Sequence, residues 1–354
     1  MSILPEVKIK ISDFDIRGCT SLDITRNLSV DADTLSVSIP NPEGRYSSWL
    51  SEMASEKRTV TVWVDKLRRF HGIIDSVNIT MDRQGGQIFS IEARDYTAKL
   101  MEMPIPKGLR SKCKGLSASQ IICKIGAELG VLVNAEATTR VWPGSWIWKE
   151  GATVWGVIKE LALKEGFLAY VDHYQQVAIQ IENPAVIVFR AKKGTEVVSQ
   201  IFFDVAGKGM GIPVEDFTID LDKSEAISKV TVVTYNPARA KAIRATAKAE
   251  NASKDAAEIT ITDGSLKDKN LAKERAEREL RARSKVKISG SFTHPYFIAI
   301  NPEDRIQLIN AGDGIDGVYY VIEVSDGLSK QGAKTTIKFN TELEYQISTE
   351  TRES

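Results

Sequence analysis

Apolar and polar residues alternate along much of the first hundred positions. Val7, Ile9 and Ile11 are separated by lysines, and residues 35–39 repeat the alternation just before the turn-forming segment 40–44. A period of two predicts strands with one buried face. Further segments of this kind follow at 60–64, 70–74 and 88–91, the last of them after a Gly-Gly pair typical of a hairpin. Residues 1–105 are therefore predicted to form an all-β unit.

The periodicity changes after the Pro- and Gly-containing segment 104–108. Ser117 and Gln120 form a capping box ahead of an apolar stripe with helical spacing, and Gly130 supplies a left-handed stop. A helix of three to four turns is predicted between them.

A second helix is predicted from Thr153 to Gly166, and the segment 167–181 is predicted to be a β-hairpin that turns at 173–175. Together with the first helix, these elements make residues 106–205 an α+β unit.

Strands return where Phe217, Ile219 and Leu221 alternate with polar residues. An Ala- and Lys-rich stretch and a charged helix at 268–284 then interrupt the β pattern. The helix has a narrow apolar stripe, so we expect the insertion to be mostly solvated or interfacial. The stripe consists of Leu271, Ala272, Ala276 and Leu280.

Segments of the two β regions resemble one another. The pairs are 58–62 with 305–309, 71–77 with 316–324, and 83–91 with 330–337. The spacings between corresponding points agree to within two residues, a difference that loops tolerate while strand registers stay fixed. Coincidence stays open, because glycine turns are common to all β-meanders. If the repeat is a duplication, a trimer presents six similar barrels around one axis, which suits contact with a six-fold assembly.

The predicted fold is mainly β with α+β insertions. Its predicted parts are a first β-barrel module (1–105), an α+β domain (106–205), a second, similar module (206–237 and 285–346), an insertion with the charged helix (238–284) and a polar tail (347–354) that we expect to be disordered.

Composition narrows the classes of function. The chain has 354 residues, 42% of them hydrophobic and 27% charged, which suits a soluble protein of about two to four domains. Lys plus Arg and Asp plus Glu number 47 each, so no global field favours a specific nucleic acid. The first residues lack a secretory signal, and no apolar run reaches the roughly 20 residues of a membrane helix, so we expect synthesis in a cytoplasm and no stable membrane insertion.

Groups suited to catalysis are sparse. The three histidines are isolated, with no second histidine at metal-ligand spacing, and the segment 206–211 lacks the following helix that a phosphate loop needs. No nucleophile elbow or zinc-protease motif occurs, so we expect no catalytic, metal or cofactor site and no enzyme. A hydrolase using Asp172 and His173 is the remaining enzymatic alternative. The three cysteines are expected to be reduced thiols.

Four of the six tryptophans fall within residues 142–155. Trp142, Trp146 and Trp148 are a candidate platform for a sugar or a partner protein, because an indole offers a broad apolar face and one hydrogen-bond donor. The alternative, which we favour, is that a small domain with few core residues uses large ones.

The combination of two terminal β modules, a middle α+β unit and a helix-bearing insertion resembles the baseplate hub family of contractile-tailed phages and phage-tail-like particles. The likeness covers nearly the whole chain and is architectural rather than a strict motif. The segments that carry it are 35–46, 70–74, 155–181 and 289–306.

The resemblance implies two tube-type β-barrels, a LysM-like middle segment, and a homotrimeric hub that adapts a six-fold tail tube to a three-fold spike. The implied partners are the tail tube protein, the spike protein and other baseplate proteins, in a virion or tail-like particle. LysM modules elsewhere bind peptidoglycan, so the alternative function is a peptidoglycan-binding or lytic accessory tail protein.

Overall fold

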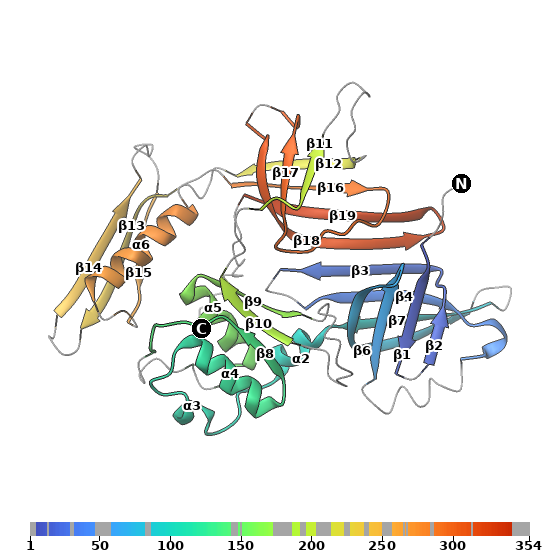
Figure 1. The fold of residues 1–354 in the computed structure, drawn as a ribbon, viewed down its shortest axis with the longest axis horizontal. Coiled ribbons are helices and arrows are strands. Elements are labelled where there is room, and N and C mark those ends of the chain that lie inside the picture. The colour runs from blue at the N-terminus through green and yellow to red at the C-terminus, as the bar shows by residue number, and fades with distance from the viewer. Residues whose placement is uncertain are drawn as a thin grey trace.

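The computed structural model describes residues 5–12, 14–28, 32–46, 58–81, 86–142, 148, 151–172, 186–191, 196–202, 214–222, 227–236, 241–249, 257–264, 266, 268–283, 287–312 and 314–341. Its largest feature is a sheet of 13 strands that runs through both terminal regions of the chain. A smaller α+β unit and a separate insertion lie beside this sheet (Figure 1). The predicted tail, 347–354, lies outside the described residues.

The first half of the large sheet comes from the N-terminal region. Its hydrogen-bonded order is β3-β4-β7-β6-β5-β1-β2, and every neighbouring pair is antiparallel. Alternating side chains such as Ile9, Val37 and Val62 are fully buried in one core. The strands are β1 (Val7–Ile11), β2 (Phe14–Arg17), β3 (Ser21–Asn27), β4 (Thr34–Pro40), β5 (Thr59–Val64), β6 (Leu67–Met81) and β7 (Gln87–Arg94), with the short 3-10 helix η1 (Pro42–Gly44) after β4.

The second half has its own core, built around Phe292, Val321 and Phe339. Its strands follow the order β12-β16-β19-β18, and β17 and β11 continue from β18. They are β11 (Ser199–Phe202), β12 (Glu215–Asp222), β16 (Lys287–His294), β17 (Arg305–Ile309), β18 (Gly317–Ser329) and β19 (Gly332–Asn340).

The two halves share one topology. The order β3-β4-β7-β6-β5 recurs as β12-β16-β19-β18-β17. The longest strand of each half carries a bulge against its hairpin partner, between Ile74 and Ser76 in β6 and between Val321 and Glu323 in β18. Aligning the bulges makes Thr59 of β5 the counterpart of Arg305, because these residues face Ile73 and Tyr320. The sequence comparison had paired Arg305 with the preceding residue, one position out of register.

The prediction of a mainly β protein with large antiparallel sheets is confirmed. The outer strands of the halves differ, since β1 is antiparallel to β5 whereas β11 is parallel to β17. The halves are also joined edge to edge by β3 and β18, so the strands of the two halves form one continuous sheet. Closure of each half into a barrel stays a prediction.

The middle unit packs helices against a three-stranded sheet of order β8-β10-β9. Ser117 and Gln120 form the predicted capping box, and Gly130 ends α4 in the left-handed region at φ 68°, so this helix is confirmed. Thr153 caps the start of α5 by accepting from Gly156 N, and Gly166 ends this helix in the left-handed region at φ 73°. The elements are α2 (Tyr96–Glu102), α3 (Leu109–Lys112), α4 (Ala118–Leu129), β8 (Leu132–Ala135), α5 (Val154–Glu165), β9 (Phe167–Asp172) and β10 (Val186–Ala191). β9 pairs antiparallel with β10, and the predicted turn at 173–175 lies outside the described residues.

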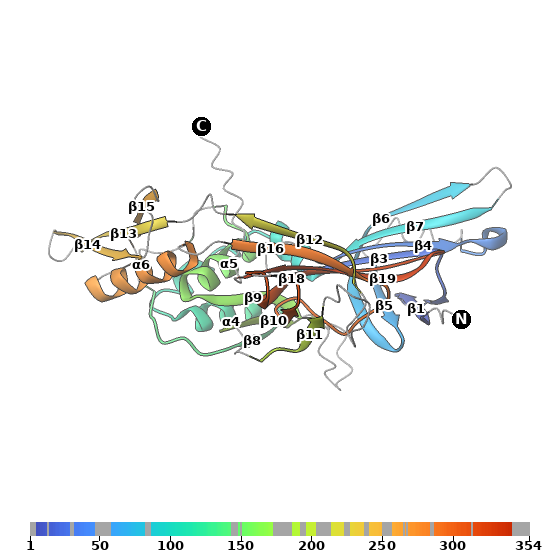
Figure 2. The same cartoon turned by 90° about the horizontal axis from the view of Figure 1, so that it is seen from above.

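The insertion is larger than predicted. It is a sheet of order β14-β13-β15 with α6 against it, and it projects to one side of the large sheet (Figures 1 and 2). Three of the four predicted stripe residues of α6, namely Ala272, Ala276 and Leu280, are buried. Its elements are β13 (Ile227–Asn236), β14 (Lys241–Lys248), β15 (Ala257–Thr262) and α6 (Lys269–Arg283).

Two predicted domain boundaries therefore shift. Residues up to 237 were assigned to the second β module, but β13 pairs with β14 and β15, since its Val230 and Val232 are buried under α6 rather than in the large sheet. β11 was assigned to the middle unit, but it pairs with β17 of the second half. An alternating strand alone does not reveal which sheet it joins.

Candidate functional site

The junction between β3 and β18 is the place where the two halves of the large sheet meet. Six residue pairs are in register there, from Asn27 opposite Glu323 to Leu22 opposite Leu328. Leu22 and Ile24 of β3 face the first core, and the next inward position along the strand is Arg26. A charged residue thus occupies a position where the period of the strand calls for an apolar one.

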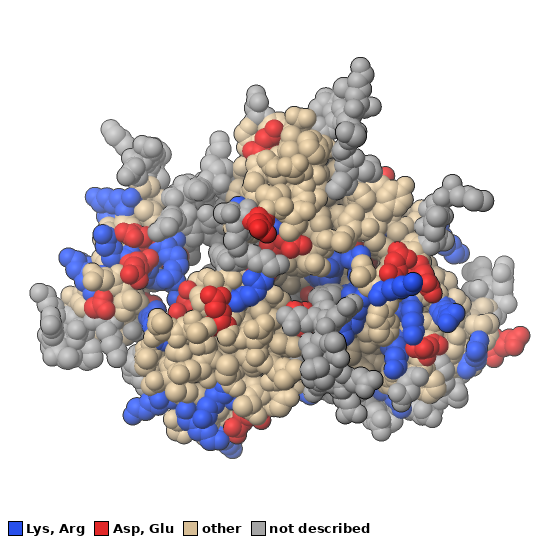
Figure 3. Space-filling model, in the orientation of Figure 1, with Lys and Arg blue, Asp and Glu red and all other residues tan. Residues whose placement is uncertain are grey.

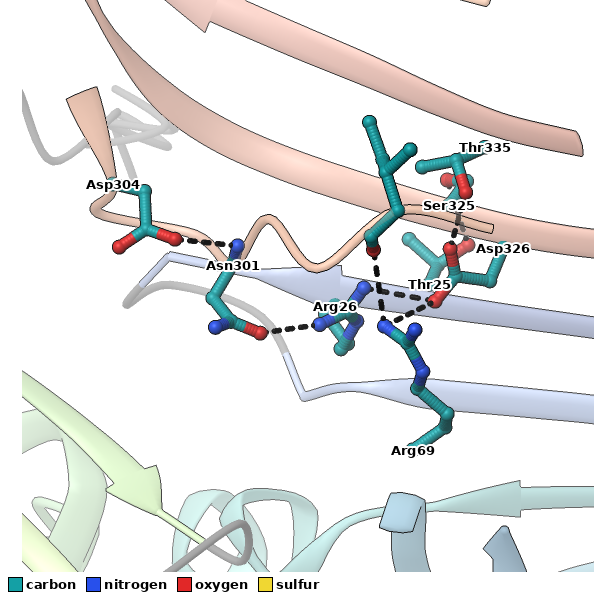
Figure 4. A network of polar contacts seen from close by, with 9 residues as sticks. Thr25, Arg26, Arg69, Asn301, Asp304, Ser325, Asp326 and Thr335 are labelled. Carbon is teal, nitrogen blue, oxygen red and sulfur yellow. Dashed lines mark hydrogen bonds and ion pairs between the residues drawn. The ribbon is translucent and has the colours of Figure 1, made fainter. Parts of the chain in front are cut away.

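Arg26 forms a buried ion pair with Asp326 across this junction. Arg26 Nη2 lies 2.8 Å from Asp326 Oδ2, and the two side chains are 1% and 0% exposed. Thr335 Oγ1 donates to Asp326 Oδ1 at 2.7 Å, and Arg69 Nη1 lies 3.6 Å from Oδ2 (Figure 4). Both carboxylate oxygens therefore have partners, which is the condition under which a buried charge is tolerated.

The same network holds the loop that precedes β17. Arg26 Nη1 donates to Asn301 Oδ1 at 2.7 Å, and Asn301 N donates to Asp304 Oδ2 at 2.8 Å (Figure 4). Arg69 Nη1 also donates to the carbonyl oxygen of Ile298. Two arginines of the first half thus fix the loop 295–304 of the second.

The middle unit is tied to this loop by another ion pair. Arg190 Nη2 of β10 lies 2.5 Å from Glu303 Oε2, and the Glu303 side chain is 2% exposed. Arg190 also donates to the hydroxyl of Tyr170. The two halves of the large sheet and the middle unit therefore meet at one polar junction, which consists of Arg26, Arg69, Arg190, Asn301, Glu303 and Asp326.

A cavity of about 170 Å³ lies beside the junction. The first half contributes Arg26 and Asp33 to its wall, the middle unit contributes Tyr170 and Asp172, and the loop before β17 contributes Asn301. A cavity of this size holds a few water molecules or one small polar group.

Two buried carboxyl groups give this cavity an unusual charge state. Burial raises the pKa of Asp33 to about 7, although the backbone N–H of Asn27 and the charge of Arg26 act in the opposite direction. Burial and then the neighbouring Asp33 raise the pKa of Asp95 well above its usual range. Asp95 also caps α2, accepting from Thr97 N at 3.1 Å and from Thr97 Oγ1 at 2.8 Å. Desolvation is the dominant cause for both groups, so protonation is favoured at the junction.

The two described histidines, His71 and His294, do not line the cavity. Thr61 Oγ1 lies 2.8 Å from Nδ1 of His71, and burial followed by Arg68 lowers the pKa of His71 to about 4. The ring of His294 accepts from Tyr296 N at 3.1 Å. Within the described part of the chain, no three His, Cys, Asp or Glu residues could hold a metal ion. Of the proposed hydrolase pair, Asp172 lines the cavity and His173 lies outside the described residues.

Two of the three platform tryptophans belong to the core of the middle unit. Trp142 is 1% exposed and Trp148 is 8% exposed, and both pack in one cluster with Trp155. The guanidinium of Arg140 lies 4.2 Å from the ring centre of Trp142, and the ammonium of Lys164 lies 5.3 Å from it. A sugar cannot stack on a ring that is already covered, so the geometry favours the core interpretation for these two residues. Trp146 lies outside the described residues.

Other sequence features have simple structural outcomes. The three cysteines are free, and burial raises the pKa of the Cys19 thiol to about 11. The glycine-rich segment 206–211 lies outside the described residues. Among the described helices, none has the length and apolar character needed to cross a membrane. On the face seen in Figure 3, basic and acidic side chains are interspersed over the insertion and the first half, in keeping with equal numbers of each.

The sequence interpretation missed the junction. Arg26 and Asp326 each occupy an inward position of an alternating strand, and that mismatch of charge and periodicity is a signal that can be read from sequence. Their pairing is not readable in the same way, because 300 residues separate them.

Comparison with solved structures identifies the fold. A tail protein from Neisseria meningitidis MC58 matches with a TM-score of 0.73 and 16% identity, over 96% of this chain and 97% of that one. The 43 kDa tail protein of prophage MuSo2 from Shewanella oneidensis matches with a TM-score of 0.69 and 15% identity, over 95% and 96%. The predicted resemblance to tail baseplate proteins is thereby confirmed at the level of the fold.

A third match comes from a secretion system. The c3393 protein of E. coli, described as a type VI secretion component with structural similarity to the T4 tail proteins gp27 and gp5, has a TM-score of 0.56 and 12% identity, over 94% of this chain and 76% of that one. No protein-family model and no curated protein sequence matches the chain.

Proposed function

We propose that this protein is a structural subunit of a phage-type contractile tail baseplate, in which three copies form a hub between a six-fold tail tube and a three-fold spike. One observation carries the proposal: the two halves of the large sheet have the same strand order and are joined edge to edge. Three such chains offer six similar modules to the tube, and the chain itself occurs three times for the spike.

The junction of buried polar residues supports this role. A subunit that must match a six-fold partner needs its two modules at a fixed angle and register. Arg26, Asp326 and Arg69 satisfy one another only when β3 and β18 are aligned as they are, so the network specifies one arrangement of the modules. The proposed function needs rigid geometry and no catalytic group, and the role is accordingly non-enzymatic.

The proposed partners are the tail tube protein, the spike protein and other baseplate proteins, in a virion or tail-like particle. The similar structures support this, because they are tail proteins and a type VI secretion component. The middle unit, in which α4 and α5 pack with a three-stranded sheet, is proposed to be a LysM-like scaffold on the outside of the ring. Peptidoglycan binding by this unit has less support, since Trp142 and Trp148 are buried.

The test is the assembly state of the purified full-length chain. Light scattering is expected to give three times the mass of one chain. The interface between copies is expected to bury roughly 2,000 Å² or more, as obligate interfaces do. Electron micrographs are expected to show rings that bind the tail tube protein on one face and the spike protein on the other. A strict monomer, with no ring even when both partners are present, would contradict the proposal.

A further inference from the structure

Among the unpaired strand edges of the large sheet within the described chain are those of β12 and of the second part of β6. β12 pairs only with β16, and the part of β6 beyond its bulge pairs only with β7. Large apolar side chains are exposed on both: Leu221 of β12 is 56% exposed, and Ile79 and Met81 of β6 are 44% and 69% exposed. Unpaired backbone edges with apolar side chains favour pairing with another strand.

The internal repeat indicates which strand that is. In the repeat β12 corresponds to β3, and β6 corresponds to β18. β3 and β18 pair with each other inside the chain, whereas their counterparts do not. One joint of the repeat is therefore filled within the chain, and the equivalent joint requires a second copy.

We infer that β12 of one copy pairs antiparallel with β6 of the next copy, in the register that β3 and β18 adopt within one chain. The inference rests on the proposed trimer and names the surface that would build it. Each copy offers one β12 and one β6, so the contact is head to tail, and such contacts close into rings when the rotation allows.

The register follows from the bulges. Aligning Ile74 with Val321 makes Val77 the counterpart of Val324 and Ile79 the counterpart of Asp326. The same alignment makes Ala93 of β7 the counterpart of Phe339 of β19. β7 lies two strands from β3, and β19 lies two strands from β12.

Counting from these positions relates β3 to β12. Leu35 faces both Ala93 and Ile24, and Gly290 faces both Phe339 and Ile219, so Ile219 is the counterpart of Ile24. Leu221, two residues further on, is then the counterpart of Arg26.

The exposed apolar residues thus lie at the positions equivalent to the buried ion pair. Within the chain Arg26 is opposite Val324 and Asp326 is opposite Ile24. Between copies the same register sets Leu221 opposite Val77 and Ile79 opposite Ile219, with Leu221 and Ile79 diagonal to each other. Diagonal neighbours on one sheet face are within reach of long side chains. Burial of Leu221 and Ile79 against each other gives both exposed side chains a partner.

The neighbouring pair of facing residues is polar in both joints. Thr25 and Ser325 face each other across the internal joint with their hydroxyl oxygens 3.2 Å apart. Their counterparts are Asp220 and Asn78, a carboxylate and an amide that can hydrogen-bond across the joint between copies.

The β3–β18 joint is ionic and the proposed β12–β6 joint is apolar. This difference favours pairing of β3 with β18 and of β12 with β6. If β3 paired with β6 of another copy, Arg26 would meet Ile79 in place of Asp326. If β12 paired with β18, Leu221 would take the place of Arg26 beside Asp326, which would lose its closest cation. The ionic joint therefore forms within the chain and the apolar joint between chains, which disfavours exchange of modules between copies.

The first test exchanges the chemistry of the joint between copies, measured on the full-length chain by light scattering. Leu221→Arg and Ile79→Asp are each expected to reduce the assembled mass threefold, to that of one chain. The double variant, which recreates the ionic pair of the internal joint, is expected to restore the ring. Leu67→Arg is the matched control, because Leu67 is 50% exposed at the β5–β6 turn, outside the joint, and its substitution should leave the ring intact.

The second test reads the register by disulfide cross-linking. In a Cys123→Ser background, Asn78→Cys with Asp220→Cys is expected to give covalent rings under oxidation, since directly opposite residues meet the geometry of a disulfide. Asn78→Cys with Thr260→Cys, on the insertion sheet, should give none. A trimer that neither cross-links nor responds to the Leu221 and Ile79 substitutions would overturn the pairing and leave the proposed hub intact. A chain that stays monomeric with its tail partners would overturn both.

Discussion

The guanidinium of Arg26 and the carboxylate of Asp326 form a buried ion pair between strands that lie 300 residues apart in the chain. One residue comes from the first half of the large sheet and the other from the second, so the pair forms only after both halves have folded and aligned. The junction therefore fixes how the two halves of the large sheet are arranged relative to each other.

Removal of one partner should expose the cost of this arrangement. Arg26→Ala leaves Asp326 buried beside Arg69 alone, and the expected loss in the free energy of unfolding is about 3 to 5 kcal/mol. The triple variant Arg26→Met, Arg69→Met and Asp326→Leu should recover most of that loss, because apolar residues of similar volume remove all three charges of the network. Denaturant unfolding of the full-length chain measures both values.

An exposed ion pair provides the control. Lys8 and Asp15 are 3.2 Å apart with side chains 46% and 54% exposed, so Lys8→Met should change the free energy of unfolding by less than about 1 kcal/mol. Equal effects of Lys8→Met and Arg26→Ala would contradict the role assigned to burial.

The sequence alone predicts much of the fold and little of the junction. The capped helices α4 and α5 and most of the alternating strands are predictable, because caps and periodicity are local signals. The assignment of β13 to the insertion and of β11 to the second half is not, because β-sheet partners are chosen by contacts distant in sequence. Arg26 is detectable as a misplaced charge, but Asn301 and Asp326 become its partners only in three dimensions.

The pKa of Asp33 predicts an unusual pH dependence of stability. The pKa of Asp33 is about 7 in the folded protein and about 3.9 in the unfolded chain. Between pH 3.9 and pH 7, roughly, the folded state therefore keeps a proton on Asp33 that the unfolded state releases. Stability contributed by Asp33 should therefore rise as pH falls through 7 and level off below about pH 4. Asp33→Asn should stabilise the protein at pH 8 and flatten this dependence.

Thermal unfolding between pH 4 and pH 8 provides the measurement for Asp33. The exposed Asp15→Asn is the control and should follow the wild-type curve. If Asp33→Asn also leaves the curve unchanged, then Asp33 ionises normally in the folded protein. The charge of Asp33 also raises the pKa of Asp95, so the difference between the curves reports Asp33 together with its effect on Asp95.

Substitutions in the tryptophan cluster can distinguish a role in the core from a role in binding. Trp142→Ala removes a buried ring that Arg140 and Lys164 contact and should cost about 3 to 5 kcal/mol in the free energy of unfolding. The wild-type protein should not be retained on purified peptidoglycan. Retention that Trp146→Ala abolishes without loss of stability would instead support the binding platform.

The ion pair between Arg190 and Glu303 should control how firmly the middle unit is held. Glu303 is almost fully buried and accepts from a guanidinium that is 24% exposed, so Glu303→Gln keeps the shape of the side chain and removes its charge. We expect a loss of about 1 to 3 kcal/mol, together with faster protease cleavage between the middle unit and the second half, because the charge-assisted bond is replaced by a weaker one. Glu323→Gln, at a partly exposed pair with Lys338, is the matched control and should leave the cleavage rate unchanged. Limited proteolysis followed by mass spectrometry locates the cut sites, and identical cleavage of Glu303→Gln and wild type would show that other contacts hold the middle unit in place.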